Sequence, residues 1–592
     1  LRFKMVSAEQ PEYLFEIYQV ALNKTKNLNY IKDEENILTS DELLINYFAE
    51  ELINIFGLKE EHVNQANLIG NSNDITTCMD GEDCPPHSPG AEYVKMLSLA
   101  GIAYGATLSD YGPMYAGTTK TYNTSLATTW SARQEYRNVA EDRDLDDDFP
   151  NYFDPFYYIE IASGKDLSNP YDQIGANDAY AYGLSGLGVK INILDSSYCP
   201  DHIDMSGKGI DTFGTVTIAT ASNAHGCHVM GLAAGKYNGN IDVNSNYSGK
   251  AAHLEGLLKY STMGVGYNAS FHYANFAGAD TWAINFGYQG CSGDNDTDCW
   301  GPQHWELASE DAKAKGAKVS SHSWGWSPDG AISVADLITY ANTNSISNYE
   351  ALVAHQAIKT NTSSYDVGFG SGSNAMDWTV GQWQEYVAAI DSFQETGVWL
   401  NAMSNDNNSN YSTAWGGAVN RTDLASGMPE FFPELQEAWI NVANVASLND
   451  GTRALVSAPC AITAAYCLSH DGYAVTSSQF TSGGSSLYTR MTGTSMATPQ
   501  VAGAIAILWE SFPDNTPELI TKRLLLTADN SWLKDNKCFE DSDGNNSFNS
   551  TTDSYTSSCG GITGTLTYNG ISHDYNDTYG HGNPDLYAAL QP

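Results

Sequence analysis

The sequence predicts an α/β fold in which helices flank a mostly parallel central sheet, and three segments indicate this fold class. Residues 191–194 form a short apolar run that ends in Asp195, as expected of a buried parallel strand with a carboxylate at its carboxyl end. A segment rich in small residues, 225–235, can pack as a helix close to such a sheet. Residues 497–509 are almost entirely apolar, which is typical of a buried helix.

The segment 493–499, Gly-Thr-Ser-Met-Ala-Thr-Pro, places Ser495 at the start of this apolar helix. Pro499 fits the first turn of a helix because no backbone donor is lost there. A serine at such a start lies beside unpaired N–H groups and the positive end of the helix dipole. That setting suits a hydroxyl that must become an alkoxide, although a plain N-cap is the alternative for Ser495 taken alone.

A base and an acid for this serine occur elsewhere in the chain. Asp195, His225 and Ser495 follow one another in a chain order known for Ser-His-Asp triads. Taken singly, Asp195 could cap a strand end, and His225 or His228 could be a hydrogen-bonded core histidine. Together, in these flanking sequences, the three residues predict nucleophilic catalysis.

At these motifs the chain resembles the subtilisin-like serine proteases, the subtilase family or peptidase S8. Residues 493–499 match the family's serine motif without a change, and 225–231 match its histidine motif with Cys227 where threonine is usual. Residues 195–204 resemble the aspartate motif, with Ser197 where glycine is usual. Other similar segments are 173–176, 186–194, 264–270 and 579–585. The resemblance spans roughly residues 165 to 592 and implies a subtilisin-like three-layer fold.

The resemblance implies a secreted serine endopeptidase that cleaves protein or peptide substrates through an acyl-enzyme on Ser495, with no cofactor in the chemistry. Residues 398–405 look like the strand and turn that present the oxyanion-hole asparagine, here Asn405. Ser404 stands where glycine is usual before this asparagine, and a plain turn asparagine is the alternative.

Residues 319–325 resemble the strand that pairs with an extended substrate, so Ser323, Trp324 and Gly325 are expected to bind substrate. In the subtilase family, smaller residues are common at the position that Trp324 occupies here. Its indole would fill volume in the adjoining pocket and favour slender substrate side chains, or alternatively it turns inward as core packing.

The composition indicates an acidic extracellular protein. With 28 Lys and Arg against 70 Asp and Glu, the net charge is −42, which argues against nucleic acid and anionic membrane surfaces as partners. The sequence holds no apolar run of 18 residues that would span a membrane. A secreted or cell-surface location is therefore expected from the cysteines and from the family.

The ten cysteines fall mostly into neighbouring pairs, whose short loops suit disulfides in an oxidising compartment. Cys199 lies just after Asp195 and Cys227 just after His225, so these two sulfurs are plausible partners if the triad assembles. A free Cys227 thiol packed under the site is the alternative. The other candidate pairs are Cys78 with Cys84, Cys291 with Cys299, Cys460 with Cys467 and Cys538 with Cys559.

Two domains are expected, because 592 residues that are 42% hydrophobic suffice for a large core and more. Residues 1–160 form an N-terminal region of mixed fold, partly helical, which is either propeptide-like or an accessory domain. Residues 161–592 form the peptidase domain, enlarged by surface insertions. These lie at about 235–251, 278–305, 326–382 and 530–575.

Asp294, Asp296 and Asp298 alternate on the loop between Cys291 and Cys299, where their hard oxygen ligands suit a structural calcium ion. A solvated acidic loop is the alternative, and residues 540–546 are a second calcium candidate without a closing glutamate. A different function also stays open: a surface or assembly protein with its own assembly partner, using the domain as a scaffold with proteolysis limited to self-processing or absent.

Overall fold

A mostly parallel sheet forms the centre of the computed structural model, as predicted. Its strand order is β12-β11-β7-β6-β5-β4-β1-β3-β2, and β8 also pairs with β6. The parallel part comprises β1 (Lys190–Asp195), β2 (Ile210–Phe213), β3 (Ser270–Asn275), β4 (Val319–His322), β5 (Val398–Ala402), β6 (Trp439–Ser447) and β8 (Cys467–His470). The remaining strands of this sheet are β7 (Arg453–Leu455), β11 (Cys538–Glu540) and β12 (Ser554–Tyr555).

The sheet and its helices belong to one unit, Gly117–Gln591. Apart from 117–140, the predicted N-terminal region lies outside the described residues, and the domain division at 160 stays a prediction. The described residues are 117–140, 167–214, 216–220, 224–239, 261–275, 302–325, 334–360, 379–405, 422, 424–480, 486–540, 554–555 and 559–591.

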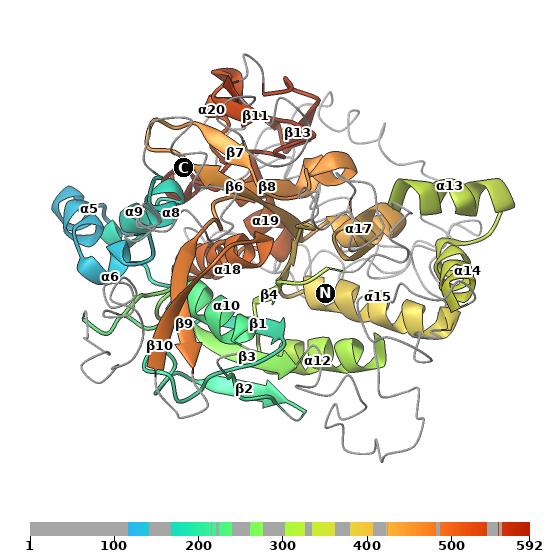
Figure 1. Cartoon of the computed structure of the whole chain (residues 1–592), viewed down its shortest axis with the longest axis horizontal. Coiled ribbons are helices and arrows are strands. Elements are labelled where there is room, and N and C mark those ends of the chain that lie inside the picture. Colours follow the sequence, from blue (N-terminus) through green and yellow to red (C-terminus); the bar gives the residue numbers. More distant parts are fainter. Residues whose placement is uncertain are drawn as a thin grey trace, which may run out of the picture. The chain divides into compact units, whose positions relative to one another are not determined.

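Helices cover both faces of this sheet (Figure 1). Helix α10 (His225–Ala234) packs against α18 (Thr494–Ser511), while α12 (Pro302–Ala314) packs against α15 (Val380–Gln394). Strand β1 is buried from Ile191 to Asp195, because helices cover it from both sides.

Helix α18 begins earlier than the sequence indicated. It starts at Thr494 after Gly493. The φ of Gly493 is 154°, a backbone conformation that residues other than glycine rarely adopt. Ser495 therefore lies inside the first turn, and Pro499 lies a turn deeper than predicted. Since proline has no N–H, the carbonyl of Ser495 loses its intrahelical donor. The Ser323 hydroxyl donates to that carbonyl instead, at 3.0 Å.

Residues 117–140 pack on the sheet domain. They contain α5 (Thr124–Ser131) and α6 (Gln134–Arg137). The N–H of Thr118 donates to the Leu590 carbonyl, and the Asn138 side chain donates to the Ser261 carbonyl. This segment is therefore part of the same unit as the sheet.

Three of the predicted insertions contain regular structure, and α12 begins within 278–305. Within 326–382, α13 (Val334–Asn344) and α14 (Asn348–Thr360) form a pair, and α13 packs against α17 (Leu424–Phe431). Within 530–575, β13 (Gly564–Tyr568) and β14 (Ile571–Tyr575) form a hairpin. The remaining elements of the described residues are α8 (Pro170–Gln173), α9 (Ala176–Ala181), η3 (Pro433–Gln436), η4 (Ala461–Tyr466), β9 (Val475–Phe480), β10 (Ser486–Met491), α19 (Pro517–Leu526), α20 (Ser531–Lys534) and α21 (Leu586–Leu590).

Candidate active site

Asp195 and His225 form a hydrogen-bonded pair between the carboxyl end of β1 and the first residue of α10. The His225 Nδ1 lies 2.8 Å from one carboxylate oxygen of Asp195 and 3.1 Å from the other. Since an ionised carboxylate only accepts, Nδ1 carries the proton and donates it. The Asp195 side chain is 3% exposed and that of His225 is 37% exposed. The carboxylate of Asp195 is thus buried, and its hydrogen bond with Nδ1 leaves Nε2 of the neutral ring without a proton.

The close approach of the acid to the base depends on Gly226. A Cβ at this position would lie 2.0 Å from the Ser197 carbonyl oxygen and 3.0 Å from the Asp195 carboxylate. Any larger residue would therefore push the start of α10 away from the end of β1. The Tyr273 hydroxyl holds that strand end from the other side by donating to the Asp195 carbonyl at 2.8 Å.

The electrostatics of the pair favour a basic imidazole. Burial acts to lower the pKa of His225, but the negative charge and hydrogen bond of Asp195 outweigh it, so the pKa is raised above its usual value of 6.5. The pKa of His228, one turn along α10, is shifted in the opposite direction. Burial lowers its pKa to about 3, and its Nε2 lies 3.2 Å from the Val475 carbonyl and 3.1 Å from the Thr489 carbonyl. His228 is therefore the hydrogen-bonded core histidine of the two.

Ser495 and Ser323 exchange two hydrogen bonds. The Ser495 hydroxyl donates to the Ser323 carbonyl at 2.9 Å, and the Ser323 hydroxyl donates to the Ser495 carbonyl at 3.0 Å. The first turn of α18 is thus joined to the residue that follows β4. Catalytic hydrogen bonds often form only when substrate binds, so a serine hydroxyl that faces a carbonyl is compatible with a nucleophile.

Asn405 lies beside the same helix start. Its side-chain oxygen accepts from the backbone N–H of Thr494 at 3.0 Å and from the Thr494 hydroxyl at 3.1 Å. Because a backbone N–H can only donate, this contact fixes the amide with its oxygen toward Thr494. The amide N–H₂ then faces away and is available to a ligand, as an oxyanion donor requires.

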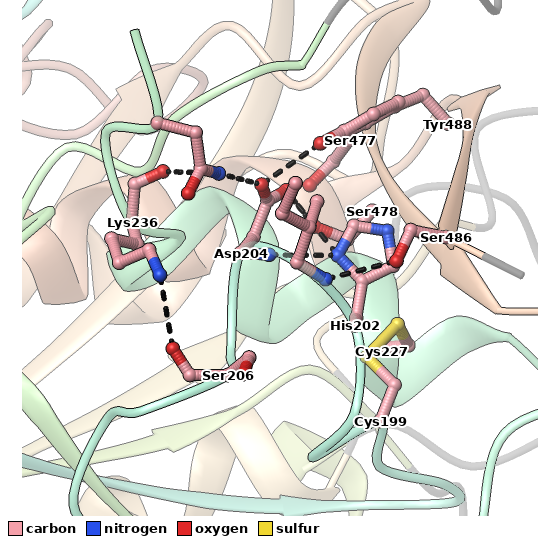
Figure 2. A network of polar contacts seen from close by, with 12 residues as sticks. Cys199, His202, Asp204, Ser206, Cys227, Lys236, Ser477, Ser478, Ser486 and Tyr488 are labelled. Carbon is pink, nitrogen blue, oxygen red and sulfur yellow. Dashed lines mark hydrogen bonds and ion pairs between the residues drawn. A yellow bond between two sulfur atoms is a disulfide. The ribbon is translucent and has the colours of Figure 1, made fainter. Parts of the chain in front are cut away.

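The disulfide Cys199–Cys227 ties the loop after Asp195 to α10, with its Cα atoms 5.4 Å apart. Figure 2 shows the polar network that lies next to it, in which Asp204 joins that loop to the β9–β10 hairpin. The Asp204 carboxylate accepts from Ser478 at 2.6 Å and from Tyr488 at 2.8 Å. Nothing in the sequence predicted this network, although Asp204 belongs to the aspartate motif.

The Asp204 carboxyl is fully buried, and this changes its acidity. Burial raises its pKa to about 7, although the hydrogen bonds from Ser478 and Tyr488 act to lower it. The neighbouring His202 is neutral because burial lowers its pKa to about 4. Its Nε2 therefore donates to the Leu487 carbonyl at 2.9 Å, and its Nδ1 accepts from the Asp204 N–H.

The indole of Trp324 is held by the sheet. Its N–H donates to the Leu194 carbonyl at 3.1 Å, and its ring packs 4.9 Å from that of Trp305 in α12. These contacts favour the second of the two expectations for Trp324, inward packing. Ser323 is buried and Gly325 is exposed, so the strand end that was expected to bind substrate runs from the core to the surface.

The structure also joins Cys460 to Cys467 and Cys538 to Cys559 in disulfides. Within the described ranges, no three His, Cys, Asp or Glu side chains gather as a metal site, and no helix is long and apolar enough to cross a membrane.

Two predicted disulfides and the predicted calcium loop fall outside the described residues. The predicted bridge between Cys78 and Cys84 lies there, so it stays a prediction. The same holds for the bridge between Cys291 and Cys299 and for the three carboxylates on its loop, which are Asp294, Asp296 and Asp298.

The structure pairs Asp195 with His225 and brings Asn405 to the start of α18. Ser495 hydrogen-bonds to Ser323, a contact that sequence reasoning missed. The signal was available, since a proline four residues after the serine leaves a carbonyl without its helical donor. The pairing of that carbonyl with Ser323 depended on the tertiary structure.

One protease of known sequence is a distant relative of the chain. The chain is 24% identical over 378 residues to the "Extracellular serine protease" of Serratia marcescens, covering 60% of this chain and 31% of the relative. It thus spans about a third of the length of that relative.

Two solved structures are similar to the chain, with low TM-scores and low sequence identity. Fervidolysin from Fervidobacterium pennivorans, described as a keratinolytic enzyme related to subtilisin, has a TM-score of 0.41 and 17% identity, covering 72% of this chain and 45% of fervidolysin. The MycP3 protease of the type VII (ESX-3) secretion system has a TM-score of 0.37 and 14% identity, covering 74% and 90%.

The comparison with protein families identifies the family of the chain. The sequence pattern of the subtilase family, Peptidase_S8, matches residues 186–551, which is more than half of the chain and includes Asp195, His225 and Ser495. The chain therefore belongs to the subtilase family of serine proteases.

Proposed function

We propose that this chain is a secreted serine endopeptidase that cleaves protein or peptide substrates through an acyl-enzyme on Ser495. The observation that carries the proposal is the Asp195–His225 pair, in which a buried carboxylate fixes the tautomer of a partly exposed imidazole. A helix N-terminus with a serine in its first turn completes the set of groups that acyl transfer needs.

In this mechanism the Ser495 hydroxyl turns from the Ser323 carbonyl toward the His225 ring. His225 takes the hydroxyl proton through Nε2 while the oxygen attacks the substrate carbonyl, and Asp195 stabilises the imidazolium. The proton then passes to the leaving amine. Water repeats the sequence on the acyl-enzyme and releases the second product.

The developing oxyanion is stabilised by the Asn405 amide and the N–H of Ser495. The orientation of the amide supports this role, because Thr494 holds its oxygen and leaves its N–H₂ for the ligand. Loss of one such donor costs roughly 3 kcal/mol of transition-state stabilisation, a value measured in a subtilisin. No cofactor takes part, and any calcium ion would be structural.

The surface after β4 is proposed to pair with an extended substrate. Gly325 is exposed and Ser323 contacts the nucleophile. Backbone pairing of this kind gives affinity with little demand on the substrate sequence. A secreted location is supported by three disulfides in the described residues and by the extracellular relative.

Treatment of the purified chain with a fluorophosphonate probe, followed by an assay on unfolded casein, tests the proposal. Labelling together with casein turnover is the expected result. Labelling without turnover would indicate that the site is occluded. Absence of labelling in folded protein would contradict the proposal and favour a scaffold.

A further inference from the structure

A row of polar side chains crosses the buried sheet on the side of α12. His272 of β3, Asn192 of β1 and Ser320 of β4 lie opposite one another in the strand register. His322 follows two residues further along β4. These four residues are between 0% and 1% exposed.

The row is one continuous chain of hydrogen bonds. The His272 Nε2 lies 2.9 Å from the Asp311 carboxylate of α12, and its Nδ1 lies 2.7 Å from the Asn192 side-chain oxygen. The Asn192 amide nitrogen is 2.8 Å from the Ser320 hydroxyl. That hydroxyl is 2.8 Å from the His322 Nε2. The chain thus runs from a carboxylate that is 28% exposed to the last residue of β4.

Such a row is unusual in a parallel sheet that is buried on both faces, where strands are normally apolar. Buried polar groups are costly unless they are hydrogen-bonded. The ring nitrogens and side-chain oxygens named above each have a partner, but the His322 Nδ1 has none among the described residues. The row therefore ends on one nitrogen, the His322 Nδ1, that has no hydrogen-bond partner among the described residues. A proton on this nitrogen would be buried without an acceptor.

His322 directly precedes Ser323, the residue that contacts the proposed nucleophile. Its ring stacks on that of Trp399, with centroids 4.0 Å apart and planes 16° apart. Since side chains alternate along a strand, His322 and Ser320 face α12, while Ser323 faces α18 and contacts Ser495. The ring of His322 thus fixes the backbone one residue before the carbonyl that meets the Ser495 hydroxyl.

Counting donors gives two arrangements of the row in which every contact is a hydrogen bond and the Ser320 hydroxyl donates its proton within the row. With the Asn192 oxygen toward His272, both nitrogens of His272 must donate, so that ring is a cation. Ser320 then donates to His322, whose own proton must lie on the unpaired Nδ1. With the Asn192 amide reversed, His272 is neutral and His322 donates to Ser320 through Nε2. Its Nδ1 then carries no proton.

We propose that His322 is a positioning residue for substrate pairing, and that one proton taken up by His272 reverses the row and loosens the end of β4. The cationic arrangement leaves a buried N–H without an acceptor, which the neutral arrangement avoids. In the acid state, the His322 ring turns away from Trp399 to find a partner, and the strand end at Ser323 shifts. This inference rests on the proposed function for its kinetic test only.

The charges around His272 place this change at acid pH. Burial lowers the pKa of His272 below its usual value, although Asp311 of α12 and Asp211 of β2 oppose that effect. Lys190 of β1 also lowers it, and Lys190 itself pairs with Asp211. His272 is therefore neutral at neutral pH, where the row holds β4 in its binding position.

The kinetic test compares peptide hydrolysis with fluorophosphonate labelling across pH in the full chain. The small probe needs the nucleophile, whereas the peptide also needs the strand. We expect the KM for an extended peptide to rise about tenfold on acidification in the natural protein, while the labelling rate follows His225 alone. Asn192→Leu, which breaks the row at similar volume, should make KM independent of pH. A KM profile of this variant that still rises on acidification would overturn the proposal.

Asp311→Asn is the second variant, at a partly exposed position where misfolding is less of a concern. Loss of the carboxylate disfavours the His272 cation, so the rise in KM should move to lower pH. An unchanged midpoint would contradict the proposal.

Nuclear magnetic resonance of ¹⁵N-histidine-labelled protein gives a readout that does not depend on activity. His272→Gln and His322→Gln assign the two signals. On acidification, His322 should change from the Nε2–H to the Nδ1–H tautomer as His272 becomes doubly protonated. If His322 keeps its tautomer, the row does not respond to the proton and the inference fails, whether or not the chain hydrolyses peptides.

Discussion

Ser323 and Ser495 each donate a hydroxyl proton to the other's carbonyl, at 2.9 and 3.0 Å. The exchange joins the end of β4 to the first turn of α18, two elements far apart in the chain. It also occupies the carbonyl that Pro499 leaves without a helical donor. A single pair of serines thus links the proposed substrate strand to the proposed nucleophile.

Removal of the proposed nucleophile should abolish activity without unfolding the protein. Ser495→Ala deletes one small hydroxyl from a site whose other groups lie on separate elements. We expect a loss of turnover on the order of a millionfold, as for the serine of subtilisin, together with loss of fluorophosphonate labelling. Casein hydrolysis and thermal unfolding of the variant check both points. Substantial hydrolysis by the pure variant would disprove the assignment.

The serine exchange should stabilise the fold. Ser323→Ala removes the donor to the Ser495 carbonyl and should lower the free energy of unfolding by about 1 kcal/mol. Labelling should persist because the backbone carbonyl of Ser323 remains. Ser321→Ala, two residues earlier in β4, is the matched control, since the Ser321 hydroxyl is buried without a partner among the described residues and its loss should cost little. Equal destabilisation of the two variants in urea would refute the role of the exchange.

The pH dependence of labelling should report His225. Only the neutral imidazole acts as a base, so activity falls as pH drops through its raised pKa, and the acid midpoint should lie above about 6.5. Asp195→Asn removes the charge that opposes burial. The midpoint should then move to lower pH, while kcat falls by about 10⁴. Labelling rates from pH 4 to 9 measure this midpoint in both proteins. An acid midpoint that is the same in Asp195→Asn as in the natural protein would argue against the Asp195–His225 pair.

Asp204 should make the fold less stable as pH rises from acid to neutral. Its pKa of about 7 exceeds the value of about 3.9 for an unfolded aspartate, so between these values the folded state binds the extra proton. The free energy of unfolding should fall as pH rises through this window, and Asp204→Asn should flatten the profile. Urea unfolding at several pH values measures it.

Asp211 is a control for Asp204, because its pKa is shifted in the opposite direction. The hydrogen bond from Lys190 lowers the pKa of Asp211, so the stability that Asp211 contributes to the fold is lost as pH falls. Because the side chain of Asp211 is exposed, this contribution is small. Asp211→Asn should therefore leave the slope between pH 4 and 7 almost unchanged. A slope that survives in Asp204→Asn would show that another group is responsible.

The Cys199–Cys227 disulfide should support stability and turnover together. Its sequence separation of 28 residues predicts roughly 3 to 4 kcal/mol of stabilisation from chain entropy, and it holds the acid loop against the base helix. Replacement of both cysteines by serine should lower the unfolding temperature and kcat. The Cys460–Cys467 disulfide, with a separation of 7, is the control and should affect stability alone. Peptide mapping without reduction that finds Cys227 as a free thiol in active protein would exclude the bridge.

The sequence by itself determined the fold class, the family and the strand and helices that carry the proposed site residues. Short-range patterns were sufficient for this: an apolar run that ends in Asp195, a helix start at Ser495 and a segment of small residues after His225. Such patterns depend on neighbours in the chain, and the strand β1 and helices α10 and α18 follow them within a few residues.

Only the tertiary structure decided which groups meet across the sheet. The start of α18 at Thr494, the inward indole of Trp324 and the contact of Ser323 with Ser495 all depend on strands that lie far apart in sequence. The row from Asp311 to His322 shows the same limit, because isolated polar residues in three strands become one hydrogen-bonded chain only when the strands pair in register. Register depends on how strands from distant segments pair and pack, so the pattern within one strand does not show which side chains meet across the sheet.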